Sequence, residues 1–428
     1  MRHGTPYPIL YPQSDASSPS DPSLPDNLVK WQTRCSCDYP VYRSLPGVLD
    51  DKIQLILHNY VPHSELQHGI PNSNLHSPRI CGAWVTALPE LSVGATGAPN
   101  GCLAFAINAL ALSITARRTG RNLLQPISSH YEHTLRLLQR DLQITGHVYE
   151  AERVAAMMCL TLLEVLSPIN PHSWLVHVGG ISELIRSSSP ELFSQGIHHT
   201  LFIGFRPLLI LRAFILRQST FFADQDWVEK PFQHNKAAPL QNLLSLAAKL
   251  PKTMQDCDAL EDESPSIAIV AASKRLTELM VIRAHLEAWS CSLTDDSSAP
   301  MYWRLASGDT IGCNNTLLWF RDLSVANVYT HLWSFQVICI SLIRNLLLRY
   351  PELERFETAI ADNTTELRDA YIELCIDIFK SMEYLLQEES MLYGLCSVWF
   401  PLYTARKALE MDEEGRAVLQ KLDLTVTL

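Results

Sequence analysis

The stretch from Met157 to Pro190 constrains the fold more than any other part of this 428-residue chain. It reads MMCLTLLEVLSPINPHSWLVHVGGISELIRSSSP. The first part is a strongly apolar run typical of a buried helix, and a Ser-Pro step and a proline-rich turn interrupt it because proline cannot continue a helical hydrogen-bond ladder. A second, amphipathic helix is predicted after the turn. The stretch therefore predicts two packed helices joined by a short connection.

Helical spacing of apolar residues also dominates the rest of the chain. Helices are predicted from DDKIQLILHNYV onward, at residues 101–117, 127–144, 266–292 and 324–349, and near the C-terminus. The faces expected to be buried are Tyr131, Leu135, Leu138 and Leu142; Val328, Leu332, Phe335, Cys339, Leu342 and Leu346; and Leu367, Tyr371, Leu374, Ile378, Met382 and Leu385. Residues 256–266 are predicted to form an acidic loop and residues 294–315 a long polar loop. No fixed repeat is visible, so the predicted fold is all-α, a large irregular helical array.

Composition divides the chain into two parts. Residues 1–47 are expected to be a disordered or transitional leader rich in Ser and Pro, and residues 48–428 the helical domain. The apolar stretch 201–216 is interrupted by charged residues and proline, so it is interpreted as a buried helix, and no membrane association is expected. The 11 cysteines are scattered without a C-x-x-C pair and several lie in apolar helices, which favours a reduced intracellular protein. The net charge of −11 argues against unaided, broad affinity for a nucleic-acid backbone.

Residue types that could carry chemistry occur without the spacing that chemistry requires. His58, His63, His68 and His76 cluster, but a polar surface loop is favoured over a zinc site because the segment gives no sign of converging ligands. Surface or capping roles are expected for His172, His198 and His199. Ser182 lacks the context of a nucleophile elbow, and no phosphate-binding glycine motif is present. No catalytic, cofactor-binding or metal-binding residues are therefore assigned.

Four residues of the organising stretch form its distinctive pattern: Trp174, His177, Gly179 and Gly180. Because glycine has no Cβ, the pair permits either close approach of another helix or a positive φ at the turn. Trp174 and His177 would pack against or cap the same junction. This structural interpretation is favoured over the alternative that the junction lines a ligand cavity.

The pattern from Leu160 to Phe193 resembles the fungal-specific transcription factor domain. It combines an apolar helix ending in LLEVL, then W-x-x-H-x-x-G-G-I-x-x-L-I, and a Ser/Pro turn before ELF. ILHNYV, CGAWVTALPEL and SSHYEHTLRLLQRDL precede it, and LFIGFRPLLILRAFI and SVWFPLYTAR follow it, in the order usual for that family. The resemblance covers roughly residues 48–428 and implies a helical regulatory region of the kind found after a binuclear zinc-cluster module.

The zinc-cluster module itself has no counterpart in this sequence. Such a cluster needs six closely spaced cysteines, whereas the segment before the helical domain resembles the linker that would follow the module. This chain is therefore not expected to bind DNA sequence-specifically by itself.

The resemblance implies a nuclear regulator of transcription, plausibly of a fungal secondary-metabolite gene cluster, that acts with another transcription factor or as a homodimer and responds to a small-molecule effector. It would be a factor without its own DNA-binding module, or the product of a truncated gene. The alternative is a cytoplasmic small-molecule-binding protein or a biosynthetic enzyme of the cyclase or isomerase type, in which cavity shape rather than a catalytic motif directs the reaction. An inert helical scaffold is the third possibility. An enzyme is the less favoured expectation.

Overall fold

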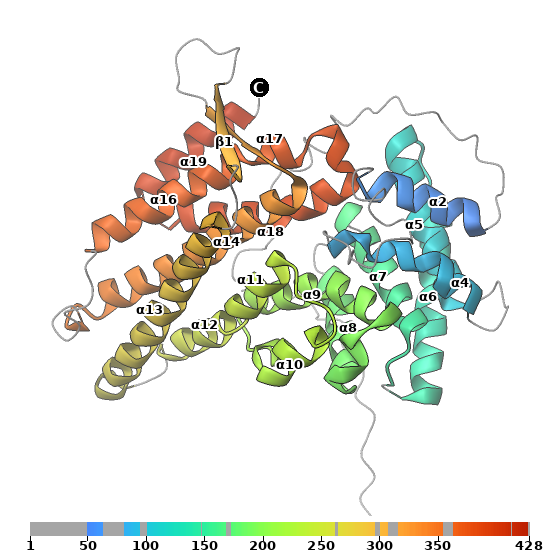
Figure 1. Ribbon diagram of the computed structural model, residues 1–428, viewed down its shortest axis with the longest axis horizontal. Coiled ribbons are helices and arrows are strands. Elements are labelled where there is room, and N and C mark those ends of the chain that lie inside the picture. The colour runs from blue at the N-terminus through green and yellow to red at the C-terminus, as the bar shows by residue number, and fades with distance from the viewer. Residues whose placement is uncertain are drawn as a thin grey trace, which may run out of the picture.

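The computed structural model describes residues 49–62, 81–94, 101–146, 148–167, 173–261, 264–295, 300–306, 316–353, 363–411 and 413–426. These residues form helices and a single two-stranded sheet, which confirms the predicted all-α array. The N-terminal helices, at the right of Figure 1, are α2 Leu49–Tyr60, η2 Cys81–Ala87, α4 Leu88–Gly94, α5 Cys102–Thr119, α6 Leu124–Thr145, α7 Ala151–Leu166 and α8 Ser173–Arg186. The connecting helices are η3 Pro190–Ser194, α9 Gly196–Leu216, η4 Phe221–Ala223, α10 Gln225–Glu229, η5 Lys230–Phe232, α11 Pro239–Ala247 and α12 Leu250–Ala259. The C-terminal elements, at the left, are α13 Pro265–Asp295, β1 Tyr302–Ala306, β2 Thr316–Phe320, α14 Leu323–Arg349, α16 Thr364–Lys380, α17 Met382–Leu385, η6 Glu388–Ser390, α18 Met391–Leu409 and α19 Glu413–Val426.

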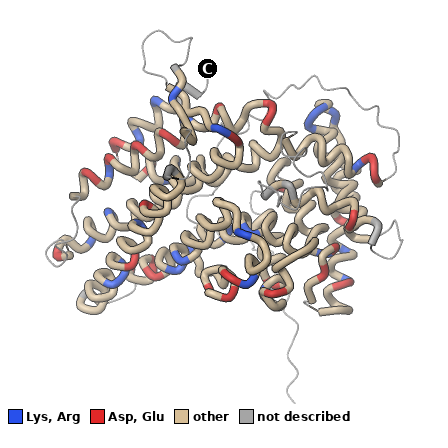
Figure 2. The backbone as a smooth tube through the Cα atoms, in the orientation of Figure 1, with Lys and Arg blue, Asp and Glu red and all other residues tan. Residues whose placement is uncertain are grey.

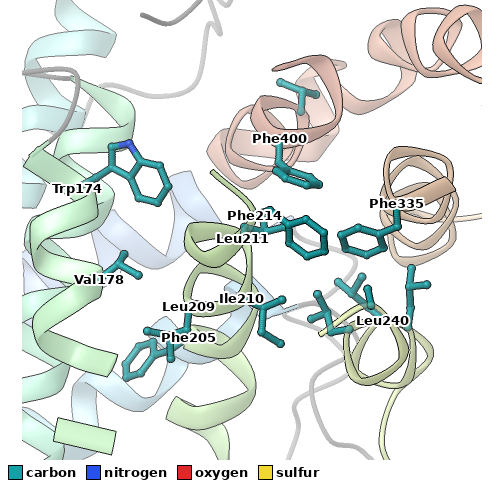
Figure 3. Close-up of a cluster of buried hydrophobic side chains, with 14 of the residues drawn as sticks. Trp174, Val178, Phe205, Leu209, Ile210, Leu211, Phe214, Leu240, Phe335 and Phe400 are labelled. Atoms are coloured by element: carbon teal, nitrogen blue, oxygen red, sulfur yellow. The ribbon is translucent and has the colours of Figure 1, made fainter. Parts of the chain in front are cut away.

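Helix α9 lies between the two groups and joins their cores. On one side it packs against α8 and η2, and on the other against α11 and α12 (Figure 1). Phe214 at its C-terminal end stacks on Phe335 of α14, with ring centroids 4.9 Å apart, and meets Phe400 of α18 edge to face at 5.7 Å (Figure 3). One continuous hydrophobic core therefore runs from α2 to α19.

Helices α9 and α14 satisfy the length and composition of a membrane span. In each, however, most of the apolar window is buried inside the fold, 67% for α9 and 72% for α14. The expectation that residues 201–216 form a buried helix is confirmed, because Leu201, Phe202, Phe205 and Phe214 are all buried. A core helix of this kind is as apolar as a span because it is covered on nearly every side.

Capping residues fix where two of the C-terminal helices begin. Asp322 accepts a hydrogen bond from the Val325 amide at the start of α14. Asn363 and Glu366 form a reciprocal capping box at the start of α16, with hydrogen bonds of 2.9 and 3.0 Å. The predicted apolar face of 328–346 is buried throughout, and that of 367–385 is buried apart from the half-buried Leu374. The second face is divided between α16 and α17, because the helix breaks at Ser381.

The predicted polar loop at 294–315 is wrong in part, because β1 lies within it. β1 pairs antiparallel with β2, and Trp303 lies opposite Trp319 in the ladder. Tyr302 and Phe320, the end pair of the ladder, contact Trp333 of α14. The hairpin is thus held by aromatic packing on α14, a long-range contact that the local sequence does not encode.

Two other predictions of local structure need correction. The start of the predicted acidic loop, residues 256–259, is the last part of α12, where Asp256 pairs with Arg275 of α13. In α6 the buried positions are Ile127, Thr134 and Leu138, whereas Leu135 is exposed. The buried face of α6 is therefore narrower than predicted, since this helix lies at the edge of the array and touches mainly α5.

Candidate functional site

The four signature residues lie on α8 and project toward four different neighbouring helices. Successive helical residues are rotated by about 100°, so positions 174, 177, 179 and 180 point in different directions around the axis. Helix α8 is enclosed by α6, α7, α9 and α18, and each signature position meets one of them. We call this arrangement the α8 junction.

Trp174 connects the α8 junction to the C-terminal half. Its ring meets that of Trp399 on α18 edge to face, with centroids 5.2 Å apart and an angle of 77°. Trp399 in turn stacks on Tyr403, one turn further along α18, at 5.5 Å and 6°. Trp174 is buried, whereas Trp399 and Tyr403 are half-buried, so this row of aromatic rings reaches from the core toward the surface.

His177 forms a hydrogen-bonded pair with Tyr131 of α6. The His177 Nε2 atom lies 2.7 Å from the Tyr131 hydroxyl oxygen, and the two rings meet edge to face at 5.9 Å. Burial lowers the pKa of His177 to about 4, so the imidazole is neutral at pH 7. A neutral imidazole beside a phenol is chemically able to relay a proton, although the same pair also joins two helices.

The two glycines allow close approach of neighbouring helices. Both lie inside α8 with helical backbone angles, and neither is among the described glycines with positive φ, so the positive-φ alternative is wrong. A Cβ on Gly179 would lie 3.1 Å from the guanidinium of Arg212 on α9, and one on Gly180 would lie 2.6 Å from the terminal methyl of Met157 on α7. Two neighbouring helices are thus in contact with α8 at these adjacent positions.

Arg212 crosses the surface that Gly179 leaves open. Its Nε atom donates a hydrogen bond to the Leu175 carbonyl oxygen at 3.1 Å, one turn before the glycine. Partial burial lowers the pKa of the guanidinium, and the nearby carboxylate of Glu183 opposes that shift. The α8–α9 contact is therefore a polar crossing inside an otherwise apolar junction.

A second buried polar cluster surrounds Arg206, and the sequence gave no indication of it. Arg206 is fully buried and donates hydrogen bonds to the Gln241 carbonyl oxygen at 2.8 Å, to Gln241 Oε1 at 3.0 Å and to Ser245 Oγ at 2.7 Å. Its guanidinium carbon lies 5.3 Å from the centre of the Phe232 ring. These contacts join α9 to α11. An arginine inside an apolar run was the only signal in the sequence, and it was interpreted merely as evidence against a membrane span.

The histidines occupy different positions from those expected. His199 is buried, not at the surface; its Nδ1–H donates to the Phe193 carbonyl oxygen at 2.9 Å, and its ring meets Phe232 edge to face. His198 is half-buried against Tyr149. Within the described ranges, no group of three or more His, Cys, Asp or Glu side chains converges as metal ligands would. His58 bonds its own helix at the Gln54 carbonyl, whereas His63, His68, His76 and His172 lie outside the described residues.

The buried cysteines are poor nucleophiles. Burial raises the pKa of the Cys102 thiol to about 11 and those of Cys339 and Cys396 to about 12. Cys159 and Cys375 are shifted upward for the same reason. A thiol acts as nucleophile only as the thiolate, so these side chains serve as small apolar residues in the core.

Comparisons with known proteins give little further information. The chain is 24% identical over 185 residues to an uncharacterized protein of the fungus Emericella nidulans. That match covers 43% of this chain and 38% of the relative, so the chain spans well under half the length of the protein it matches. No family model and no solved structure matches.

Proposed function

We propose that this chain is a helical regulatory region that controls transcription through protein partners, plausibly in the control of a fungal secondary-metabolite gene cluster. The observation that carries the proposal is the α8 junction. The pattern that resembles the fungal-specific transcription factor domain forms one packed unit, in which Trp174, His177, Gly179 and Gly180 meet four other helices. The similarity to a fungal protein is consistent with this origin.

The charge distribution supports action through a partner rather than direct binding to DNA. The net charge is −11, and basic and acidic positions are interspersed along the described helices (Figure 2). A phosphate backbone is bound by clustered Lys and Arg, whose counterion release supplies most of the affinity. The proposed regulator would therefore reach its genes through a nuclear DNA-binding partner.

A reporter assay with the full chain tests the proposal. The chain is fused to an unrelated DNA-binding module, and transcription of a reporter is measured with the wild type and with Trp174→Ala, which removes the α8–α18 aromatic contact. We expect the fusion to change reporter output at least several-fold and Trp174→Ala to abolish the change. His285→Gln, an exposed substitution on α13, is the matched control and should behave as wild type. A fusion that is nuclear and stable but leaves the reporter unchanged contradicts the proposal.

The Tyr131–His177 pair favours a second candidate, a small-molecule-binding protein or a biosynthetic enzyme of the cyclase or isomerase type. A neutral imidazole 2.7 Å from a phenol could take up and return a proton during such a reaction. In this case Tyr131→Phe and His177→Gln would stop turnover while leaving gene expression intact.

Transcripts and metabolites measured together distinguish the two functions. The strain lacking the gene is complemented with wild type, with Tyr131→Phe or with the control His285→Gln. A regulator predicts that transcripts of a defined gene set collapse without the gene and return with all three chains. An enzyme predicts normal transcripts throughout, with an unreacted intermediate in the deletion and Tyr131→Phe strains.

A further inference from the structure

Helix α13 lies at the periphery of the array, and only one of its faces packs against the fold. The inner face, which includes Ala272, Leu276, Leu279 and Leu286, is buried against α11, α12 and α14 (Figure 1). The helix has 31 residues, which makes it the longest described helix, although neighbours cover it on only one side. Its opposite face is therefore open to contacts from outside the described fold.

That opposite face carries a regular stripe of exposed residues. The stripe, which we call the outer seam, consists of Ile267, Val270, Lys274, Thr277, Val281, Ala284, Ala288 and Cys291, all exposed. Its members alternate at intervals of three and four, which is the 3.5-residue period of a coiled-coil contact. Ile267, Val270 and Val281 are 57, 70 and 48% exposed, although such residues are normally buried. The period indicates that the partner of this face is another helix.

We propose that the outer seam pairs with the same seam of a second copy of this chain, antiparallel, about a two-fold axis near Leu279. In that register Ile267 meets the partner's Cys291, and Val270 meets the partner's Ala288. Lys274 meets the partner's Ala284, and Thr277 meets the partner's Val281. Each layer combines a larger with a smaller side chain, so the helices stay evenly spaced over about 36 Å.

Charges favour the antiparallel register over the parallel one. A parallel pair would place Lys274 against the partner's Lys274 inside the seam, whereas the antiparallel pair separates these ammonium groups by about 15 Å along the axis. The antiparallel register also places Lys274 beside the partner's Glu287, and Glu278 beside the partner's His285. Both carboxylates are at least one-third exposed and have in-chain arginine partners, Arg275 and Arg283, so they can accept a further donor at the rim. This inference does not depend on the proposed function.

The mass of the full chain in solution tests the pairing. Light scattering coupled to size-exclusion chromatography should give about twice the 48.2 kDa of one chain. Val281→Glu places a carboxylate next to the two-fold axis in both copies, so the dissociation constant should rise roughly 100-fold or more. The matched control is Ile144→Glu on α6, an equally apolar side chain that is 71% exposed and lies outside the seam; it should leave the dimer intact. A monomeric wild type, or a Val281→Glu chain that stays folded and dimeric, overturns the proposal.

Disulfide trapping tests the register. Ile267→Cys should give a covalent dimer under mild oxidation, because the new thiol faces the partner's Cys291, and adding Cys291→Ser to this variant should prevent the cross-link. The wild type should not cross-link through Cys291, since the two copies of that residue lie at opposite ends of the paired seams. A wild-type cross-link that Cys291→Ser removes would show a parallel pair and overturn the antiparallel register.

Discussion

The contact between α9 and η2 yields a quantitative prediction about Gly204. This glycine lies on α9 where the helix crosses Trp84, which is fully buried and meets Phe205 edge to face at 5.3 Å. A Cβ at position 204 would lie 2.8 Å from Trp84 Cγ and 2.9 Å from Cδ1. Carbon atoms in contact normally lie about 3.5–4.0 Å apart, so the alanine methyl would overlap the indole by roughly 0.7 Å. The indole cannot turn away, because its own neighbours fill the space around it.

The magnitude follows from two opposing terms. Alanine stabilises a helix interior by about 1 kcal/mol relative to glycine. Overpacking by one methyl group in a rigid core costs about 1–3 kcal/mol, and a buried indole with no room to move belongs at the upper end. We therefore expect Gly204→Ala to lower the free energy of unfolding by about 2 kcal/mol. The same change at Gly179 meets only the end of the half-buried Arg212 side chain at 3.1 Å, so it should be neutral or stabilising by up to about 1 kcal/mol.

Urea unfolding of the wild type, Gly204→Ala and Gly179→Ala, followed by circular dichroism, measures the difference. Gly204→Ala should unfold at a clearly lower urea concentration than Gly179→Ala, with similar slopes. Changing Trp84 to Phe in the Gly204→Ala background should recover part of the loss, because the smaller ring vacates the overlap. Equal midpoints for the two alanine variants, or no recovery with Trp84→Phe, would refute the steric argument.

Three further predictions concern buried groups. Burial lowers the pKa of His177 and His331 to about 4, below the usual value of about 6.5 in an unfolded chain, so the unfolded state binds more protons between these values; the free energy of unfolding should fall as pH drops from about 6.5 to 4, and His177→Gln should reduce that slope in a pH series of urea unfolding. Arg206→Ala should cost about 3 kcal/mol of stability by leaving the acceptors on Gln241 without a buried donor, and a thermal or urea midpoint equal to wild type would contradict this. Phe335→Ala should cost about 3–5 kcal/mol, because the ring is fully buried between the two halves of the fold; a loss below about 1 kcal/mol in the same assay would show that the core closes over the cavity.

Much of the fold could be predicted because helical periodicity is a local property. The run DDKIQLILHNYV predicts the position of α2, and the spacing of Val328, Leu332 and Phe335 predicts which face of α14 is buried. Both depend only on residues within a few turns of one another. The boundaries of α14 and α16 also follow from local side-chain caps.

The features that sequence reasoning missed depend on contacts between distant segments. Strand β1 was predicted as loop because its residues become a strand only by pairing with β2 and packing on Trp333. His199 was expected at the surface, whereas the Phe193 carbonyl and the Phe232 ring enclose it. The α8 junction was found as a pattern, but its partners Tyr131, Arg212, Met157 and Trp399 could not be named, because nothing in a single sequence specifies which helix faces which.

The outer seam of α13 shows why an exposed face can be hidden in a sequence. Its Ile and Val residues stand among the Ala, Leu and Ile residues of the inner face, so the whole helix has the composition of a core helix. Only burial separates the two stripes: Leu276 and Leu279 are inaccessible, whereas Val270 and Val281 are not. A helix that needed solubility alone would carry charged residues on its outer face, as the exposed Glu132 and Arg136 of α6 illustrate. On α13 Lys274 is the one charged member of the outer seam, and in the antiparallel register it prevents a parallel arrangement while lying beside a carboxylate of the second copy. A seam with this composition is therefore better explained by a helical partner than by solvent.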